Sequence, residues 1–188
     1  MELINRGYLE RKLARILGKD LRAELSTLMG YLGNPPLLEN VPYTYWQNGW
    51  KDIAKDVEPV LMDIYLQQAE GLMAEISIGV DWGMINTTAS RWSRKHGETV
   101  LKKLFDTTYD GVNEIIPKFY DEGWNIGELR TALERWHSPV RAEMIAVTEA
   151  TRAAVEGERA IIAELEKSNG IRMIPIWITQ NDELVCPI

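Results

Sequence analysis

The feature that most constrains the fold of this chain is a row of apolar residues near its start. These residues recur at intervals of three and four: Leu9, Leu13, Ile16, Leu17, Leu21, Leu25, Leu28, Met29 and Leu32. Such intervals place the apolar side chains on one side of an α-helix, and Arg11, Lys12 and Arg15 fall on the other. The pattern predicts a long amphipathic helix that ends near Pro35 and Pro36, because consecutive prolines remove amide donors.

Further stretches repeat the helical spacing along the chain. We expect one helix through Val57 to Ile76, with Pro59 in its first turn or at a kink. A second should begin at a capping Asp81 and continue to Phe105. The segment 109–120 predicts a separate, shorter helix that is broken or kinked at Pro117, because proline cannot donate to the preceding turn.

The next boundaries carry clear capping signals. Asn125 followed by Glu128 has the form of a capping box, and Ser138 before Pro139 is typical of a helix start. The last helix should run from Pro139 to about Ser168, where an Asn-Gly pair ends it. Small residues recur along it and predict close approach of another helix: Ala142, Ala146, Ala150, Ala153, Ala154, Ala160 and Ala163.

After residue 170 the pattern changes from helical to extended. Residues 171–179 are rich in β-branched and aromatic side chains, and Asn181-Asp182 would let residues 184–186 pair back. We therefore predict a mainly α fold, a multi-helix body of long amphipathic helices with a small C-terminal β-hairpin or strand element. An N-terminal amphipathic helix (1–32) is expected to open this body.

Aromatic residues gather between positions 43 and 50, and tryptophans recur after them. Tyr43, Tyr45, Trp46 and Trp50 predict a core or helix-docking cluster, although a ligand platform is an alternative. The tryptophans expected to anchor the core or an interface are Trp46, Trp50, Trp82 and Trp92.

Composition narrows the function classes. A net charge of −7 argues against a protein whose whole surface binds nucleic acid, and a single cysteine excludes an internal disulfide framework. The start of the chain has no charged-plus-apolar leader, and no apolar run is long enough to span a membrane, so we expect no membrane partner and a reducing compartment.

Common catalytic motifs are absent from the sequence, including Gly-rich phosphate loops, G-x-S-x-G, H-E-x-x-H and EF-hand patterns. Cys186 has only His96 and His137 as further soft ligands, and these are too few for a zinc site. His137 is expected to satisfy a helix-terminal carbonyl or to face water. We therefore predict no catalytic residues, no metal and no cofactor.

Two polar groups stand out. The expected helix after Asp81 carries a basic strip, which is either a phosphate-facing surface or a solvated helix face: Arg91, Arg94, Lys95, His96, Lys102 and Lys103. On the last helix, Thr148, Glu149, Thr151 and Arg152 lie within little more than one turn. We expect them to join this helix to the terminal β element, with a catalytic Thr-Glu-Arg set as the alternative.

Residues between about Phe119 and Pro187 resemble the phage minor head proteins, the Mu protein F-like head morphogenesis family. The segments that carry the resemblance are Gly123-Trp124-Asn125-x-x-Glu128-Leu129, then Ala146-x-Thr148-Glu149-x-Thr151-Arg152 with Gly157, then Gly170, Trp177, Thr179, Asp182, Cys186 and Pro187. Two departures are Val147, where the family often has arginine, and Ala150, where it often has threonine. The chain also ends where the second cysteine of a C-x-x-C element would stand, which predicts a C-terminally truncated form. The resemblance further implies that the chain after the first helix divides into a variable helical region (33–118) and a C-terminal core (119–188).

The resemblance implies a virion structural or assembly protein, present in few copies in the phage or prophage head and in the host cytoplasm during assembly. It implies the portal and capsid proteins as partners, leaves open a contact with packaged DNA and an oligomeric state, and implies no enzymatic reaction. Two other interpretations stay open from the residues alone. One is an enzyme or effector domain on a helical scaffold with no recognisable motif, and the other is a DNA-contact module that uses the basic strip.

Overall fold

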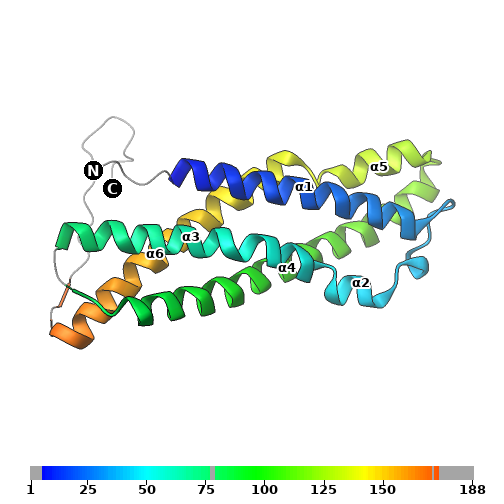
Figure 1. Cartoon of the computed structure of the whole chain (residues 1–188). Coiled ribbons are helices and arrows are strands. Elements are labelled where there is room, and N and C mark those ends of the chain that lie inside the picture. Colours follow the sequence, from blue (N-terminus) through cyan, green and yellow to red (C-terminus); the bar gives the residue numbers. More distant parts are fainter. Residues whose placement is uncertain (1–5, 77–78, 171, 174–188) are drawn as a thin grey trace, which may run out of the picture.

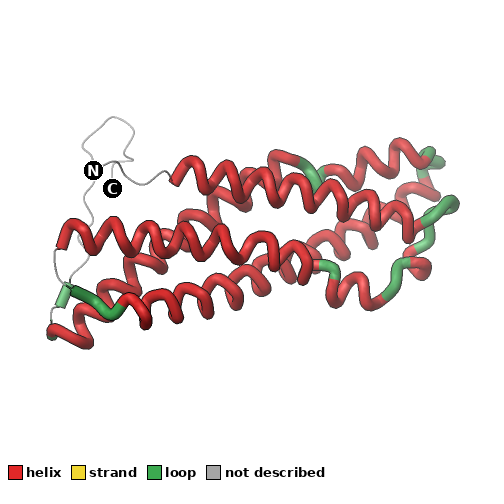
Figure 2. Tube along the Cα trace, viewed as in Figure 1, coloured by secondary structure: helices red, strands yellow, loops and turns green. Residues whose placement is uncertain are grey.

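The computed structural model describes residues 6–76, 79–170 and 172–173, and it is mainly α-helical (Figures 1 and 2). Its elements are α1 (Arg6–Leu32), the 3-10 helix η1 (Leu38–Asn40), α2 (Tyr43–Asn48), α3 (Trp50–Ile76), α4 (Trp82–Asp121), α5 (Ile126–Glu134) and α6 (Pro139–Asn169). No strand occurs among the described residues. Apart from Arg172 and Met173, the segment predicted to form the C-terminal β element lies outside them.

Four long helices, α1, α3, α4 and α6, run along the length of the molecule, and α2 and α5 lie toward one end (Figure 1). The most extensive contacts join α6 to α3, α6 to α1 and α3 to α4. The last long helix, α6, is therefore packed mainly against α1 and α3. None of the described helices is long and apolar enough to cross a lipid bilayer.

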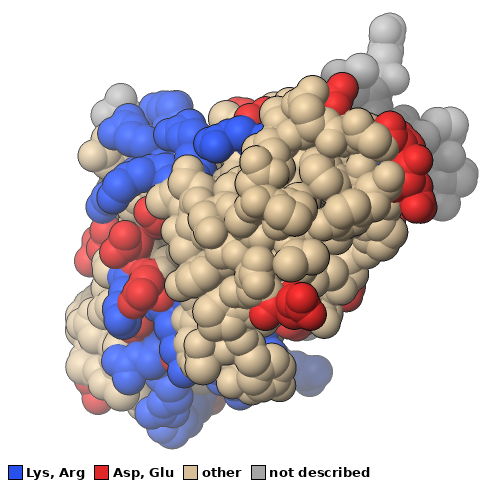
Figure 3. Space-filling view, turned by 90° about the vertical axis from the view of Figure 1, so that its right-hand side faces the viewer, with Lys and Arg blue, Asp and Glu red and all other residues tan. Residues whose placement is uncertain are grey.

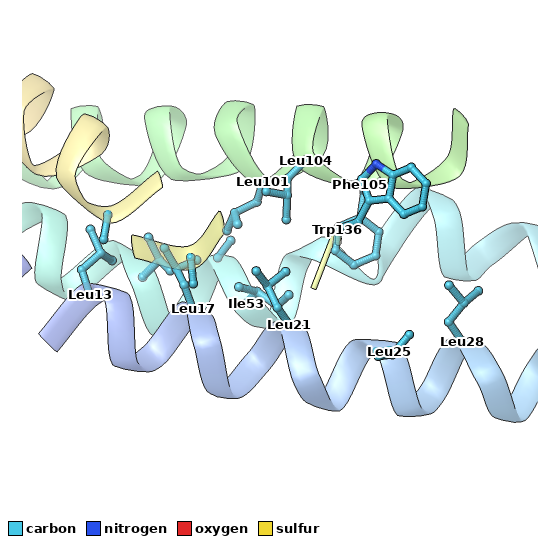
Figure 4. Packing of buried hydrophobic residues seen from close by; sticks show 14 of the residues in the cluster. Leu13, Leu17, Leu21, Leu25, Leu28, Ile53, Leu101, Leu104, Phe105 and Trp136 are labelled. Carbon is cyan, nitrogen blue, oxygen red and sulfur yellow. The ribbon is translucent and has the colours of Figure 1, made fainter. Parts of the chain in front are cut away.

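The predicted apolar row forms the buried side of α1. Its buried members are Leu9, Leu13, Leu17, Leu21, Leu25, Leu28 and Leu32. Figure 4 shows this row facing Ile53 of α3 and Leu101, Leu104 and Phe105 of α4. The main core thus lies between the helices along most of their length, as the spacing predicts.

One predicted boundary is wrong. The segment 109–120 is not a separate helix, because α4 continues without interruption from Trp82 to Asp121. Gly111 lies inside this helix, and a Cβ there would come within 2.2 Å of the Trp136 ring. The indole of Trp136 therefore packs directly on the α4 backbone. This contact helps to stabilise the helix here, although glycine and the nearby proline both disfavour a helix interior.

Both helix-interior prolines have exposed side chains. Pro59 lies well inside α3 instead of in its first turn, and Pro117 lies near the end of α4. Each leaves a carbonyl of the preceding turn without its usual amide donor. Because both rings are on the solvent side, water can reach the freed carbonyls, and the helices continue.

The predicted caps are confirmed. Asn125 and Glu128 form a reciprocal capping box, Ser138 accepts from the Arg141 amide, and Asp81 accepts from the Met84 amide. Gly170 follows α6 with φ of 65°, the left-handed conformation that ends many helices.

The small-residue face of α6 allows the close approach that its alanines predict. A Cβ on Gly157 would lie 2.2 Å from the Tyr65 carbonyl oxygen, so the backbones of α6 and α3 are nearly in contact there. Ala146, Ala150 and Ala153 are fully buried on the same helix. This contact fixes the height of α6 against α3 and so sets where the polar residues of α6 lie.

Candidate functional site

Glu149 is a buried carboxylate on the inner side of α6. Only 6% of the residue is exposed, although Thr148 and Thr151 beside it are on the solvent side. The neighbouring buried positions are alanines, which leave room for a larger side chain from another helix. A buried carboxylate needs partners for both oxygens, because losing hydration without compensation is costly.

His96 of α4 and Arg152 of α6 supply those partners. His96 Nε2 lies 2.5 Å from Glu149 Oε2, and Arg152 Nη1 donates to Glu149 Oε1 at 3.0 Å. The His96 ring also stacks on Trp92, with centroids 4.6 Å apart and an interplanar angle of 11°. The imidazole is thus held by its stack on one side and by the carboxylate at its tip.

The Glu149 cluster joins α6 to α4 across a separation of 53 residues in the sequence. Two residues of the predicted polar group on α6, Glu149 and Arg152, are therefore in contact, and His96 of α4 joins them. The sequence pattern instead predicts His96 on the exposed basic strip. That placement of His96 is wrong, because its side chain is only 21% exposed. Any contact of the group with the C-terminal segment lies outside the described residues.

A small hollow of about 340 Å³ opens beside this cluster. Its lining combines the Trp92 and His96 rings with residues of α6: Thr151, Arg152, Val155, Glu156 and Arg159. Arg159 pairs with Glu156 at 2.7 Å, so the charges at its rim largely balance. The Thr148 and Thr151 hydroxyls donate to carbonyls of their own helix, at Met144 and Val147. The Glu149 contacts with His96 and Arg152 thus hold α4 and α6 together at this hollow.

The basic strip of α4 lies on solvent, and its members are Arg91, Arg94, Lys95, Lys102 and Lys103. Arg94 pairs with Glu58 of α3 at 3.3 Å. Lys102 instead lines a hollow together with Asp106 and Tyr109, farther along the same helix. The strip is therefore a discontinuous row of cations, part of it paired with carboxylates.

The sequence patterns did not predict a second charged feature, an acidic surface hollow. An acidic hollow of about 730 Å³ lies between α1, α2 and α3, with carboxylates from Asp20, Glu24, Asp52 and Asp56 and the Tyr31 and Tyr45 rings. Burial and the nearby Asp52 charge raise the pKa of Glu24 to about 7. A hydrogen bond from Tyr45 acts in the opposite direction. Burial and the nearby Asp56 charge also raise the pKa of Asp20, whose Oδ2 is buried without a hydrogen-bond partner.

These carboxylates gave no sequence signal because they come from separate helices and flank apolar rows. Within the described residues, no group of three or more His, Cys, Asp or Glu side chains could hold a metal ion. Exposed Lys55 already pairs with Asp52 at 2.7 Å. The hollow is therefore an acidic surface on which two carboxyl groups, Asp20 and Glu24, have raised pKa values.

His137 is buried at the junction of α5 and α6, and its Nδ1 lies 3.0 Å from the Leu133 carbonyl oxygen. It satisfies a helix-terminal carbonyl, as predicted. Burial lowers the pKa of His137, which favours the neutral ring. Arg141 donates to the Trp136 carbonyl at 2.6 Å beside it, so the junction is closed by hydrogen bonds.

The remaining residues of the predicted motif, Trp177, Thr179, Asp182 and Cys186, lie outside the described residues. Comparison of the chain with protein-family models, with curated proteins and with solved structures gave no match.

Proposed function

We propose that this chain is a minor head protein of a phage or prophage, which acts in head assembly with the portal and the capsid shell. The observation that carries the proposal is the order and spacing of two segments. These are Gly123-Trp124-Asn125-x-x-Glu128-Leu129 and Thr148-Glu149-x-Thr151-Arg152. The first contains the capping box of α5, and the second contains the buried carboxylate of α6.

A role through protein surfaces is supported by the outer side of α6. Four apolar side chains are exposed along it, at Val140 (65%), Met144 (67%), Val147 (47%) and Val155 (39%). They recur at intervals of four, three and eight, so they share one side of the helix. An exposed apolar row of this kind suits a contact with another protein in an assembly.

The proposal predicts that the chain is a virion component. Purified virions and procapsids of the source phage should contain it in few copies, and it should co-purify with the portal or the major capsid protein. Absence from both particles would refute the proposal. Replacing Met144 and Val147 with serine should weaken the co-purification, whereas the same change at Thr148 should not, because Thr148 is already polar.

Contact with packaged DNA is a finer part of the proposal, carried by the exposed cations of α4. Reversing Arg91, Lys95 and Lys103 to glutamate should lower DNA affinity and flatten its salt dependence, since each neutralised phosphate contributes about 0.9 to the slope for duplex DNA. Arg94 is left unchanged in this variant because it pairs with Glu58. Unchanged DNA affinity would remove this part of the proposal and leave the assembly role in place.

A further inference from the structure

A hollow of about 850 Å³ lies between α2, the start of α3 and the second half of α4. Aromatic side chains dominate its wall: Tyr43, Trp46, Trp50, Phe105 and Tyr109. The volume falls in the range of pockets that take small ligands or short peptide segments. Figure 3 views the molecule from the end at which α2 and α5 lie, and most of the surface facing the viewer carries no charge.

The wall of this aromatic hollow is fixed by ring packing. The Trp46 ring meets Tyr45 edge-on at 4.7 Å and Tyr109 edge-on at 5.0 Å, and Tyr45 packs on the buried Phe105 at 5.9 Å. Gly49 permits this arrangement, because a Cβ there would lie 2.8 Å from Phe105 Cε1. The Trp46, Phe105 and Tyr109 rings are thus held in place before any ligand binds, which lowers the ordering cost of binding.

The charge of the aromatic hollow disfavours an ionic ligand. Two lysines, Lys51 and Lys102, and two carboxylates, Glu39 and Asp106, line it, so the formal charges cancel. A nucleic-acid strand would need a net positive groove beside the rings. The occupant that matches this lining is therefore uncharged.

The wall of the aromatic hollow also contains an indole hydrogen-bond donor. Trp46 is half-buried and its indole N–H has no hydrogen-bond partner among the described residues, whereas the Trp50 indole donates to the Gln47 carbonyl at 2.9 Å. Tyr43 is 74% exposed and Tyr109 is 44% exposed, so both present ring surface. The wall therefore offers flat aromatic faces together with the Trp46 indole N–H as a hydrogen-bond donor.

We infer that the aromatic hollow binds an uncharged, proline-rich peptide segment of a partner protein. Proline rings stack on aromatic side chains, and a polyproline helix leaves its carbonyl groups without internal hydrogen bonds, so they can accept from the Trp46 indole. Such a helix loses little conformational entropy on binding. The inference stands apart from the proposed role in head assembly, since it depends only on this wall.

A titration of the full chain with a blocked decaproline peptide tests the inference. Indole ¹⁵N–¹H spectra resolve the tryptophans, of which the sequence has seven, and Trp46→Phe assigns the Trp46 signal. We expect saturable shifts of the Trp46 and Trp50 signals and no shift of Trp82, which lies at the start of α4 away from the hollow. Affinity should be nearly the same at low and high salt.

Variants separate binding from folding. Tyr43→Ala and Tyr109→Ala remove exposed rings, so the fold should be retained while affinity falls about tenfold in each, the scale expected for one aromatic contact. Trp46→Phe should weaken binding about threefold to tenfold through loss of the donor. Trp82→Phe is the matched control and should bind as the unaltered chain does.

Three results would overturn the inference. One is the absence of any Trp46 shift at millimolar peptide. Another is binding that Tyr43→Ala and Tyr109→Ala leave unchanged. The third is saturation of the same signals by a neutral oligosaccharide such as maltohexaose when decaproline has no effect, which would assign the hollow to sugars.

Discussion

Glu24 offers the sharpest test of the packing described above, because its carboxyl group is held where a charge is unfavourable. Its pKa is raised from 4.5 to about 7, mainly by burial and further by the Asp52 charge. The folded chain therefore binds a proton at Glu24 that the unfolded chain releases between these two pH values. Stability contributed by this group is fully present below about pH 4.5 and is lost as the pH rises through 7.

The magnitude follows from the size of this shift. Each pKa unit corresponds to about 1.4 kcal/mol, so the full shift gives an upper bound of about 3.4 kcal/mol at pH 8. Glu24 is only partly buried, and solvent screening reduces this bound to about 1–2 kcal/mol. We expect Glu24→Gln to be more stable than the unaltered chain by that amount at pH 8, because the amide is neutral and still accepts from Tyr45.

Guanidinium unfolding of the two proteins at several pH values between 4.5 and 8 measures the difference. The gap in unfolding free energy should be near zero at pH 4.5 and should reach its full size above pH 7. The matched control is Glu98→Gln, which removes a carboxylate from the exposed side of α4. The reasoning is refuted if the gap for Glu24→Gln is independent of pH, or if the variant is less stable at pH 8.

Three further predictions concern the contacts between helices. Gly157→Ala should lower the unfolding free energy by about 2–3 kcal/mol, because the new methyl group meets the Tyr65 backbone, whereas Gly71→Ala meets nothing within 4 Å and should be neutral or slightly stabilising in thermal melts. Glu149→Ala should lower it by about 2–4 kcal/mol by leaving His96 without its partner, whereas loss of the more exposed Glu156–Arg159 pair in Glu156→Ala should lower it by less than about 1 kcal/mol. Burial lowers the pKa of His137, so the folded chain favours the neutral ring and the unfolding free energy should fall as the pH drops below about 6.5. His137→Asn should reduce this loss of stability in acid, as measured by denaturant titrations at several pH values. A pH profile that the substitution leaves unchanged would contradict this role of His137.

The helices were predictable where the sequence carries a local signal. The leucine row of α1 and the caps at Asp81, Asn125 and Ser138 depend on residues within one or two turns of each other, and each is confirmed. The continuity of α4 was not predictable from such signals. This stretch buries Val112, Ile115 and Ile116 in the core, and Trp136, which is distant in sequence, packs on Gly111.

The candidate site likewise contains residues that the sequence predicts and residues that only the fold brings together. The polar residues of α6 are visible in the sequence because they lie within about one turn, but their partner His96 is on another helix and adjoins no matching motif. Glu24 is similar, because its raised pKa arises from burial between three helices and, to a lesser extent, from the Asp52 charge. Pairings of this kind depend on how helices pack, and periodicity alone does not report them.

The Tyr45 ring connects the two hollows at the α2 end of the bundle. Its hydroxyl hydrogen-bonds to Glu24 in the acidic hollow, and its ring supports Trp46 in the aromatic hollow. Loss of the Glu24 charge should leave the ring in place, because glutamine keeps an acceptor for the hydroxyl. The stability gain of Glu24→Gln should therefore come without a change in decaproline affinity. Tyr45→Phe, in contrast, removes the hydroxyl and leaves the Glu24 carboxylate without its donor, which raises the penalty at pH 8 while the ring still supports Trp46.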